Sequence, residues 1–72
     1  MKVLILGANG YLGPHVVKAL EGEHELLITD IKAPAAPTRH EFRLADITDL
    51  DQVTRAAEGQ DAILNLAVLR GH

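Results

Sequence analysis

Apolar residues along this chain gather in short runs that are separated by glycines and polar residues. Runs of this length and setting predict β-strands, most of them buried on both faces. The predicted strands cover residues 2–6, 25–29, 41–45 and 62–69, the third of them by its alternation of polar and apolar side chains. The proline-rich segment 33–37 is predicted as an extended loop, because each proline disfavours helical geometry in the residue before it.

Two segments between the strands carry apolar residues at helical spacing. The first predicts a helix over residues 11–21 that stops at Gly22. The second predicts a helix that begins at an N-cap Thr48 and ends at Gly59. The expected buried positions are Leu12, Val16, Ala19 and Leu20 on the first helix and Leu50, Val53 and Ala57 on the second.

The elements follow one another in the order β-α-β-β-α-β. Right-handed crossovers between parallel strands place the two helices on opposite faces of the sheet and give the strand order 3-2-1-4. The sequence therefore predicts an α/β fold, the N-terminal half of a Rossmann-type doubly wound parallel sheet, as one domain over residues 1–72. One helix per face covers four strands poorly, so we expect self-association or a further part of the protein to cover the rest.

Composition narrows the classes of partner. The 72 residues carry a formal net charge of −3 and scattered Lys and Arg, which argues against a nucleic-acid partner. The absence of cysteine excludes disulfides and thiolate metal sites, and the four histidines lack metal-ligand spacing. No apolar run approaches the ~20 residues of a membrane span, and no signal peptide is visible. We therefore expect a cytoplasmic domain without a membrane or metal partner.

A glycine-rich turn joins the first predicted strand to the first helix. Gly7, Gly10 and Gly13 have the spacing G-x-x-G-x-x-G. The first glycine allows a sharp turn, the second a close approach of phosphate to the backbone, and the third close packing of helix and strand. The helix N-terminus can then hold a pyrophosphate. Asp30 ends the next strand about 20 residues further on, where a carboxylate accepts hydrogen bonds from a ribose.

These features predict a dinucleotide site rather than a purely structural turn. The charge of Asp30 would repel a 2′-phosphate and favours NAD over NADP, although Lys32 lies close enough to weaken that preference. FAD and S-adenosylmethionine use similar turns and stay open as alternatives. After the third strand, Asp46 and Ile47 either flank an adenine or, in the case of Asp46, belong to the capping cluster of the second helix.

A catalytic pair is missing from these residues. The chain has no serine, and Tyr11, its one tyrosine, lies in the predicted phosphate turn. No two side chains are spaced as a nucleophile and its base would be. The residues themselves thus predict binding without catalysis.

The segments 7–13, 45–47 and 65–68 together with Asp30 resemble the N-terminal part of the extended short-chain dehydrogenase/reductase family. Within it, the resemblance is to NAD-dependent epimerases and dehydratases that act on sugar nucleotides and related sugars. It covers essentially the whole chain and implies a set of cofactor contacts. These are Gly7, Asn9, Gly10, Tyr11, Leu12 and Gly13 around the pyrophosphate, Asp30 and Ile31 at the adenosine ribose, Asp46 and Ile47 at adenine, Leu66, Ala67 and Val68 beneath the nicotinamide side, and Arg70 from the loop that follows.

Members of that family use a Tyr-x-x-x-Lys pair for acid/base chemistry while hydride passes to or from the nicotinamide. The 72 residues contain no such pair. The resemblance therefore implies the NAD-binding portion of a longer oxidoreductase, inactive by itself. The alternatives are a non-catalytic dinucleotide-binding module and a structural fragment that self-associates.

Overall fold

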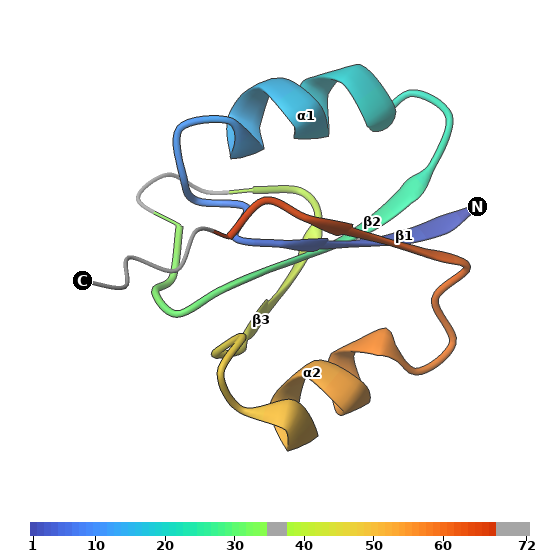
Figure 1. Ribbon diagram of the computed structural model, residues 1–72. Coiled ribbons are helices and arrows are strands. Elements are labelled where there is room, and N and C mark those ends of the chain that lie inside the picture. Colours follow the sequence, from blue (N-terminus) through green and yellow to red (C-terminus); the bar gives the residue numbers. More distant parts are fainter. Residues whose placement is uncertain (35–37, 68–72) are drawn as a thin grey trace.

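The computed structural model describes residues 1–34 and 38–67, in which a parallel sheet lies between two helices (Figure 1). The sheet has four strands in the order β3-β2-β1-β4, and every neighbouring pair is parallel. The strands are β1 (Lys2–Leu6), β2 (Glu25–Asp30), β3 (Glu41–Leu44) and β4 (Ala62–Asn65), and the helices are α1 (Gly13–Leu20) and α2 (Leu50–Ala57). The predicted α/β class and the predicted strand order are confirmed.

The two central strands, β1 and β2, carry the core on both of their faces. Because successive side chains of a strand point to opposite faces, each strand contributes to two apolar clusters. The cluster beneath α1 contains Val3, Ile5, Ala8, Leu26 and Ile28, with Val16, Val17 and Leu20 of the helix packed against it. The cluster beneath α2 contains Leu4, Leu6, Leu27 and Ala56, with Val53 and Ala57 beside it. This double burial explains why both strands are nearly continuous apolar runs.

The first helix is shorter than predicted, and its buried face is different. α1 begins at Gly13, because the glycine turn continues as far as Leu12 and delays the first helical residue. The side chain of Leu12 is 57% exposed, and Ala19 is also exposed, so the prediction that both are buried is wrong. Val17, which the predicted face omitted, packs on the core instead.

The second helix is capped by Asp49 and not, as predicted, by Thr48. The Asp49 carboxylate accepts from the N–H of Gln52 at 3.2 Å. The Thr48 hydroxyl donates to the Asp46 carboxylate at 2.7 Å and is therefore engaged elsewhere. Leu50 is 77% exposed, so its predicted burial is wrong as well. Ala56 takes its place on the face that meets the sheet.

The edge strands are covered far less than the centre. β4 ends at Asn65, so the predicted strand over 62–69 was too long within the described residues. Ile63 and Leu64 on β4 and Leu44 on β3 are exposed, as expected for four strands with one helix on each face. Neither described helix is long and apolar enough to cross a membrane.

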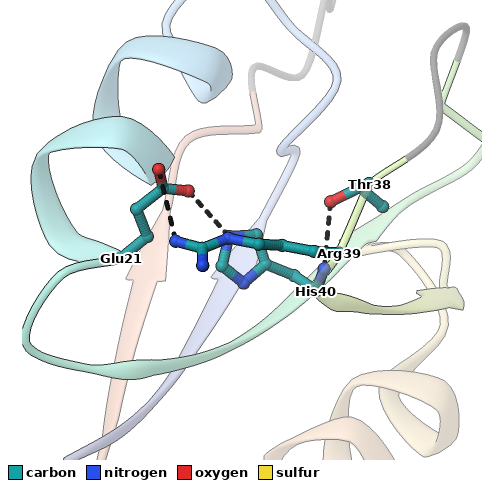
Figure 2. Close-up of polar contacts among 4 residues, drawn as sticks. All are labelled: Glu21, Thr38, Arg39 and His40. Carbon is teal, nitrogen blue, oxygen red and sulfur yellow. Dashed lines mark hydrogen bonds and ion pairs between the residues drawn. The ribbon is translucent and has the colours of Figure 1, made fainter.

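A polar cluster ties the end of α1 to the segment before β3 (Figure 2). His40 Nε2 donates to Glu21 Oε2 at 2.9 Å, and Arg39 Nη2 lies 3.4 Å from the other carboxylate oxygen. Thr38 Oγ1 accepts from the backbone N–H of His40 at 3.2 Å. The bond from His40, together with the charge of Arg39, lowers the pKa of the Glu21 carboxyl below its ordinary value.

Candidate functional site

A cavity of about 520 Å³ opens at the carboxyl ends of all four strands. Ligands of doubly wound sheets bind at this edge, where the strand order reverses, and in this sheet the reversal falls between β1 and β4. The cavity is lined by Gly7, Gly10, Tyr11, Leu12, Asp30, Ile31, Ala45, Asp46, Ile47, Leu66 and Ala67. The structure thus brings together residues that the sequence analysis selected from four separate segments.

The glycine turn is held in place by main-chain bonds to the end of β2. The N–H groups of Gly7 and Ala8 both donate to the carbonyl of Thr29 at 3.0 Å. Gly7 has a φ of +77°, and a Cβ at this position would lie 2.6 Å from the backbone nitrogen of Ala67. Both the conformation and the close neighbour therefore require glycine at position 7.

The other two glycines of the turn have different surroundings. The nearest atom to a Cβ on Gly10 would be the Gly7 oxygen at 3.4 Å, so this side of the turn stays open toward the cavity. A Cβ on Gly13 would lie 1.7 Å from the oxygen of Ala8. Gly13 thus packs the helix start against the turn residue that follows β1, and it lies outside the cavity walls.

The main-chain N–H groups of the turn divide into two sets. Those of Gly7, Ala8, Asn9, Gly10 and Gly13 are bonded to acceptors within the chain. Those of Tyr11 and Leu12 have no acceptor within the part of the chain that the structure describes. Both residues line the cavity, so the donors left for an anion lie at its wall, at the start of α1.

Asp30 is oriented at the cavity by two backbone donors. Its Oδ2 accepts from the N–H of Asn9 at 2.9 Å, and its Oδ1 accepts from the N–H of Ile31 at 2.7 Å. A carboxylate oxygen has two acceptor positions, so each oxygen keeps one for a ligand. The carboxylate is therefore fixed in direction and still able to accept from hydroxyl groups.

Asn9 is placed differently from the residues around it. Its side-chain Nδ2 donates to the carbonyl of Lys32, and the residue is not among those lining the strand-end cavity. It borders a second cavity of about 630 Å³ beside α1, together with Lys32. No pattern in the sequence points to a bond between residues 23 positions apart.

Asp46 takes part in local bonds beside the second helix and also lines the cavity, so its contact with adenine stays a prediction. Its Oδ1 accepts from the hydroxyl and the N–H of Thr48, at 2.7 and 2.9 Å, which is a local capping arrangement. These two bonds lower the pKa of the Asp46 carboxyl, the hydroxyl contributing most. Asp46 and Ile47 also line the cavity. Ala45, which was not among the predicted site residues, lines the cavity too, and its N–H donates to the Asp30 carbonyl at 3.0 Å.

Large apolar side chains surround the cavity mouth. Tyr11 is 89% exposed and Ile31 63%, and both line the cavity together with the exposed Leu12. The Tyr11 ring lies 6.1 Å from that of His15, centroid to centroid, at a tilt of 55°. Exposed apolar groups gathered at one cavity indicate a surface for an apolar part of a ligand.

The fourth wall comes from the residues after β4. The N–H of Leu66 donates to the carbonyl of Leu6 at 2.8 Å, and that of Ala67 to Asn65 Oδ1 at 2.9 Å. Val68 and Arg70, the remaining predicted site residues, lie outside the described residues. Over residues 1–34 and 38–67, no group of three or more His, Cys, Asp or Glu side chains is arranged to hold a metal ion.

The sheet order and the strand-end cavity define a Rossmann-type architecture. Solved dehydrogenases share this fold, among them a partial-consensus L-threonine 3-dehydrogenase with a TM-score of 0.86 over 96% of this chain at 24% identity. The sequence profile of the NAD dependent epimerase/dehydratase family matches residues 3–72. The chain belongs to this family.

Proteins with sequences similar to this chain are named for different activities. GDP-mannose 3,5-epimerase 1 of Oryza sativa subsp. japonica is 32% identical over 99% of this chain. Uronate dehydrogenase of Pseudomonas syringae pv. tomato is 39% identical over 89% of it. A mutant uronate dehydrogenase from Agrobacterium tumefaciens, solved as a complex with NAD, matches 94% of the chain with a TM-score of 0.81 and 27% identity.

The chain spans only a part of each of these relatives. It covers 20% of the epimerase, 24% of the Pseudomonas dehydrogenase and 26% of the Agrobacterium structure. The shared part is nearly the whole of this chain, from 89% to 99% of it.

Proposed function

We propose that this chain forms the NAD-binding portion of an epimerase/dehydratase-type oxidoreductase that acts on a sugar nucleotide or a related sugar. The observation that carries the proposal is the strand-end cavity, where the open side of the glycine turn and the oriented carboxylate of Asp30 line one space. Its volume of about 520 Å³ is within the range of small-molecule sites, roughly 300–1,000 Å³.

Each part of a dinucleotide has a chemically suitable wall. The N–H groups of Tyr11 and Leu12, which have no acceptor among the described residues, suit the pyrophosphate, because a helix N-terminus favours negative charge. The free acceptor positions of Asp30 suit the ribose hydroxyls. Ile31 lies beside Asp30 at the ribose position, and Ile47 with Asp46 offers a surface for adenine, as the resemblance implies.

The nicotinamide end then falls to Leu66 and Ala67, across the cavity after β4. When bound, the nicotinamide supplies hydride transfer, and the protein supplies binding and orientation. The mutant uronate dehydrogenase complexed with NAD supports this choice of cofactor, since it matches almost the whole chain.

NAD is the expected cofactor, in preference to NADP. A 2′-phosphate would stand beside the carboxylate of Asp30, whose charge repels it. Lys32 could offset that repulsion, but it borders the second cavity and not the first.

The sugar part of the proposal is supported by the relatives named for GDP-mannose and uronate. Conversion of the sugar needs an acid/base group, and the 72 residues contain no Tyr-x-x-x-Lys pair. We therefore assign cofactor binding to these residues and propose that turnover needs the remainder of a longer protein.

Calorimetric titration of the 72-residue chain with NAD tests the proposal, with circular dichroism to verify that each sample is folded. We expect saturable binding that Asp30→Asn weakens by about 10–100-fold, because hydrogen bonds to a charged group contribute roughly 1.5–3 kcal/mol. Asp51→Asn removes the same charge from an exposed position in the first turn of α2 and should leave affinity unchanged. A folded chain that shows no saturable response to NAD contradicts the proposal.

A further inference from the structure

Asn9 connects the glycine turn to the segment after β2 through two hydrogen bonds. Its backbone N–H donates to Asp30 Oδ2, and its side-chain Nδ2 donates to the carbonyl of Lys32. The first bond uses the main chain and is kept by any residue at position 9 that has a backbone N–H. The second depends on the amide of asparagine.

The two cavities separate the residues on either side of this connection. Asp30 and Ile31 line the strand-end cavity, whereas Lys32 lines the cavity beside α1, next to Lys18 and Asn9 itself. The lysine ammonium stands on a flexible four-carbon stem. The position of the Lys32 main chain therefore sets which cavity the ammonium reaches. The Asn9 amide holds that main chain in place by donating to the Lys32 carbonyl.

We propose that Asn9 is a specificity-determining positioning residue, which preserves the preference for NAD over NADP by keeping Lys32 out of the strand-end cavity. The inference rests on the proposed dinucleotide function. In this role Asn9 acts through Lys32 and not by touching the cofactor, which differs from the direct pyrophosphate contact that the family resemblance implies.

Loss of the amide leaves the carboxylate of Asp30 oriented and frees only the Lys32 segment. The ammonium can then approach the ribose end of the cavity, offset the charge of Asp30 and pair with a 2′-phosphate. An exposed ion pair corresponds to about a two- to fivefold change in affinity, and a phosphate carries more than one charge. We expect the affinity for NADP relative to NAD to rise about fivefold.

A double-mutant cycle tests this role. NAD and NADP are each titrated into the 72-residue wild type, Asn9→Ala, Lys32→Ala and the double variant, and the ratio of the two dissociation constants is compared. Asn9→Ala should shift the ratio toward NADP about fivefold when Lys32 is present, and should leave it unchanged when Lys32 is replaced. Lys18→Ala, which removes another lysine bordering the cavity beside α1, should leave the ratio unchanged.

The outcomes separate this inference from the proposed function. If wild type binds NAD but the ratio does not move, or moves equally in both backgrounds, the positioning role is wrong and the binding function stands. If folded wild type binds neither dinucleotide, the proposed function and the inference both fail. If Asn9→Ala does not fold, Asn9→Ser takes its place in the double-mutant cycle. The serine hydroxyl is too short to replace the asparagine amide at the Lys32 carbonyl.

Discussion

Replacing Gly13 by alanine should destabilise the fold strongly, although alanine is the better helix former. The new Cβ would lie 1.7 Å from the oxygen of Ala8 and 2.4 Å from its carbonyl carbon. Both are backbone atoms, so no side-chain rotation relieves the overlap. The start of α1 and the turn after β1 would have to separate by more than about 1 Å.

The cost follows from what holds Ala8. This residue is 5% exposed, and its N–H donates to the Thr29 carbonyl at 3.0 Å. Overpacking costs roughly 1–3 kcal/mol, and a buried N–H that loses its acceptor costs about 1–3 kcal/mol more. Helix propensity returns at most about 1 kcal/mol. We expect a net loss of about 3 kcal/mol, a large share of the roughly 4–10 kcal/mol typical of a domain this size.

Three other glycines provide matched controls, because they separate crowding from conformation. Gly22 has open space and no positive φ, and its alanine variant should stay within about 0.5 kcal/mol of wild type. Gly59 has open space but a φ of +76°, which predicts a loss of roughly 1–2 kcal/mol. Gly7 has both a positive φ and a crowded Cβ, and should lose at least as much as Gly13.

Urea unfolding followed by circular dichroism measures these free energies, and thermal unfolding gives an independent check. For a chain this short, about 3 kcal/mol corresponds to a fall in Tm of roughly 12–24 °C. If Gly13→Ala is as stable as Gly22→Ala, the contact with Ala8 does not constrain the turn, and close packing does not account for the third glycine.

Two further predictions concern charged groups outside the strand-end cavity. The bond from His40 lowers the pKa of the Glu21 carboxyl, so this carboxylate stabilises the fold above its unfolded pKa, and that contribution is lost as pH falls through the folded pKa. When the free energy of unfolding is measured as a function of pH, Glu21→Gln should therefore lose less stability below about pH 4.5 than the matched variant Glu23→Gln. Asp49→Ala should lose about 1 kcal/mol in urea unfolding because it removes the observed N-cap of α2, whereas a larger loss in Thr48→Ala would return the cap to the residue that the sequence favoured.

The strands and their order could be predicted because they depend on strong and simple signals. β1 and β2 are buried on both faces and therefore consist largely of apolar residues. The right-handedness of crossovers then leaves few orders for four parallel strands. β4 was predicted too long because Leu66 and Ala67 are apolar for another reason, as walls of the cavity and, in the case of Ala67, as a neighbour of Gly7.

The ends of the helices could not be predicted as well, because competing local bonds decide them. Thr48 and Asp49 both carry an oxygen that can cap a helix, and Asp46 decides between them by accepting from the Thr48 hydroxyl. Leu12 and Leu50 fit the helical spacing of their segments, yet both stand at a helix start and remain exposed. Periodicity identifies a face but not the residue at which that face meets the sheet.

Within the candidate site, how well a contact could be predicted from the sequence depends on the chemical group that makes it. The proposed anion position depends on main-chain N–H groups at Tyr11 and Leu12, which glycine spacing alone locates. The proposed ribose position depends on one carboxylate, Asp30, which the end of β2 locates. The proposed effect of Asn9 on cofactor preference depends on a long-range bond from its side chain to the Lys32 carbonyl, which no local pattern encodes. Substitutions at Tyr11 should therefore reduce the affinity for NAD less than substitutions at Asp30. The backbone donor at Tyr11 survives a change of side chain, whereas the carboxylate of Asp30 does not.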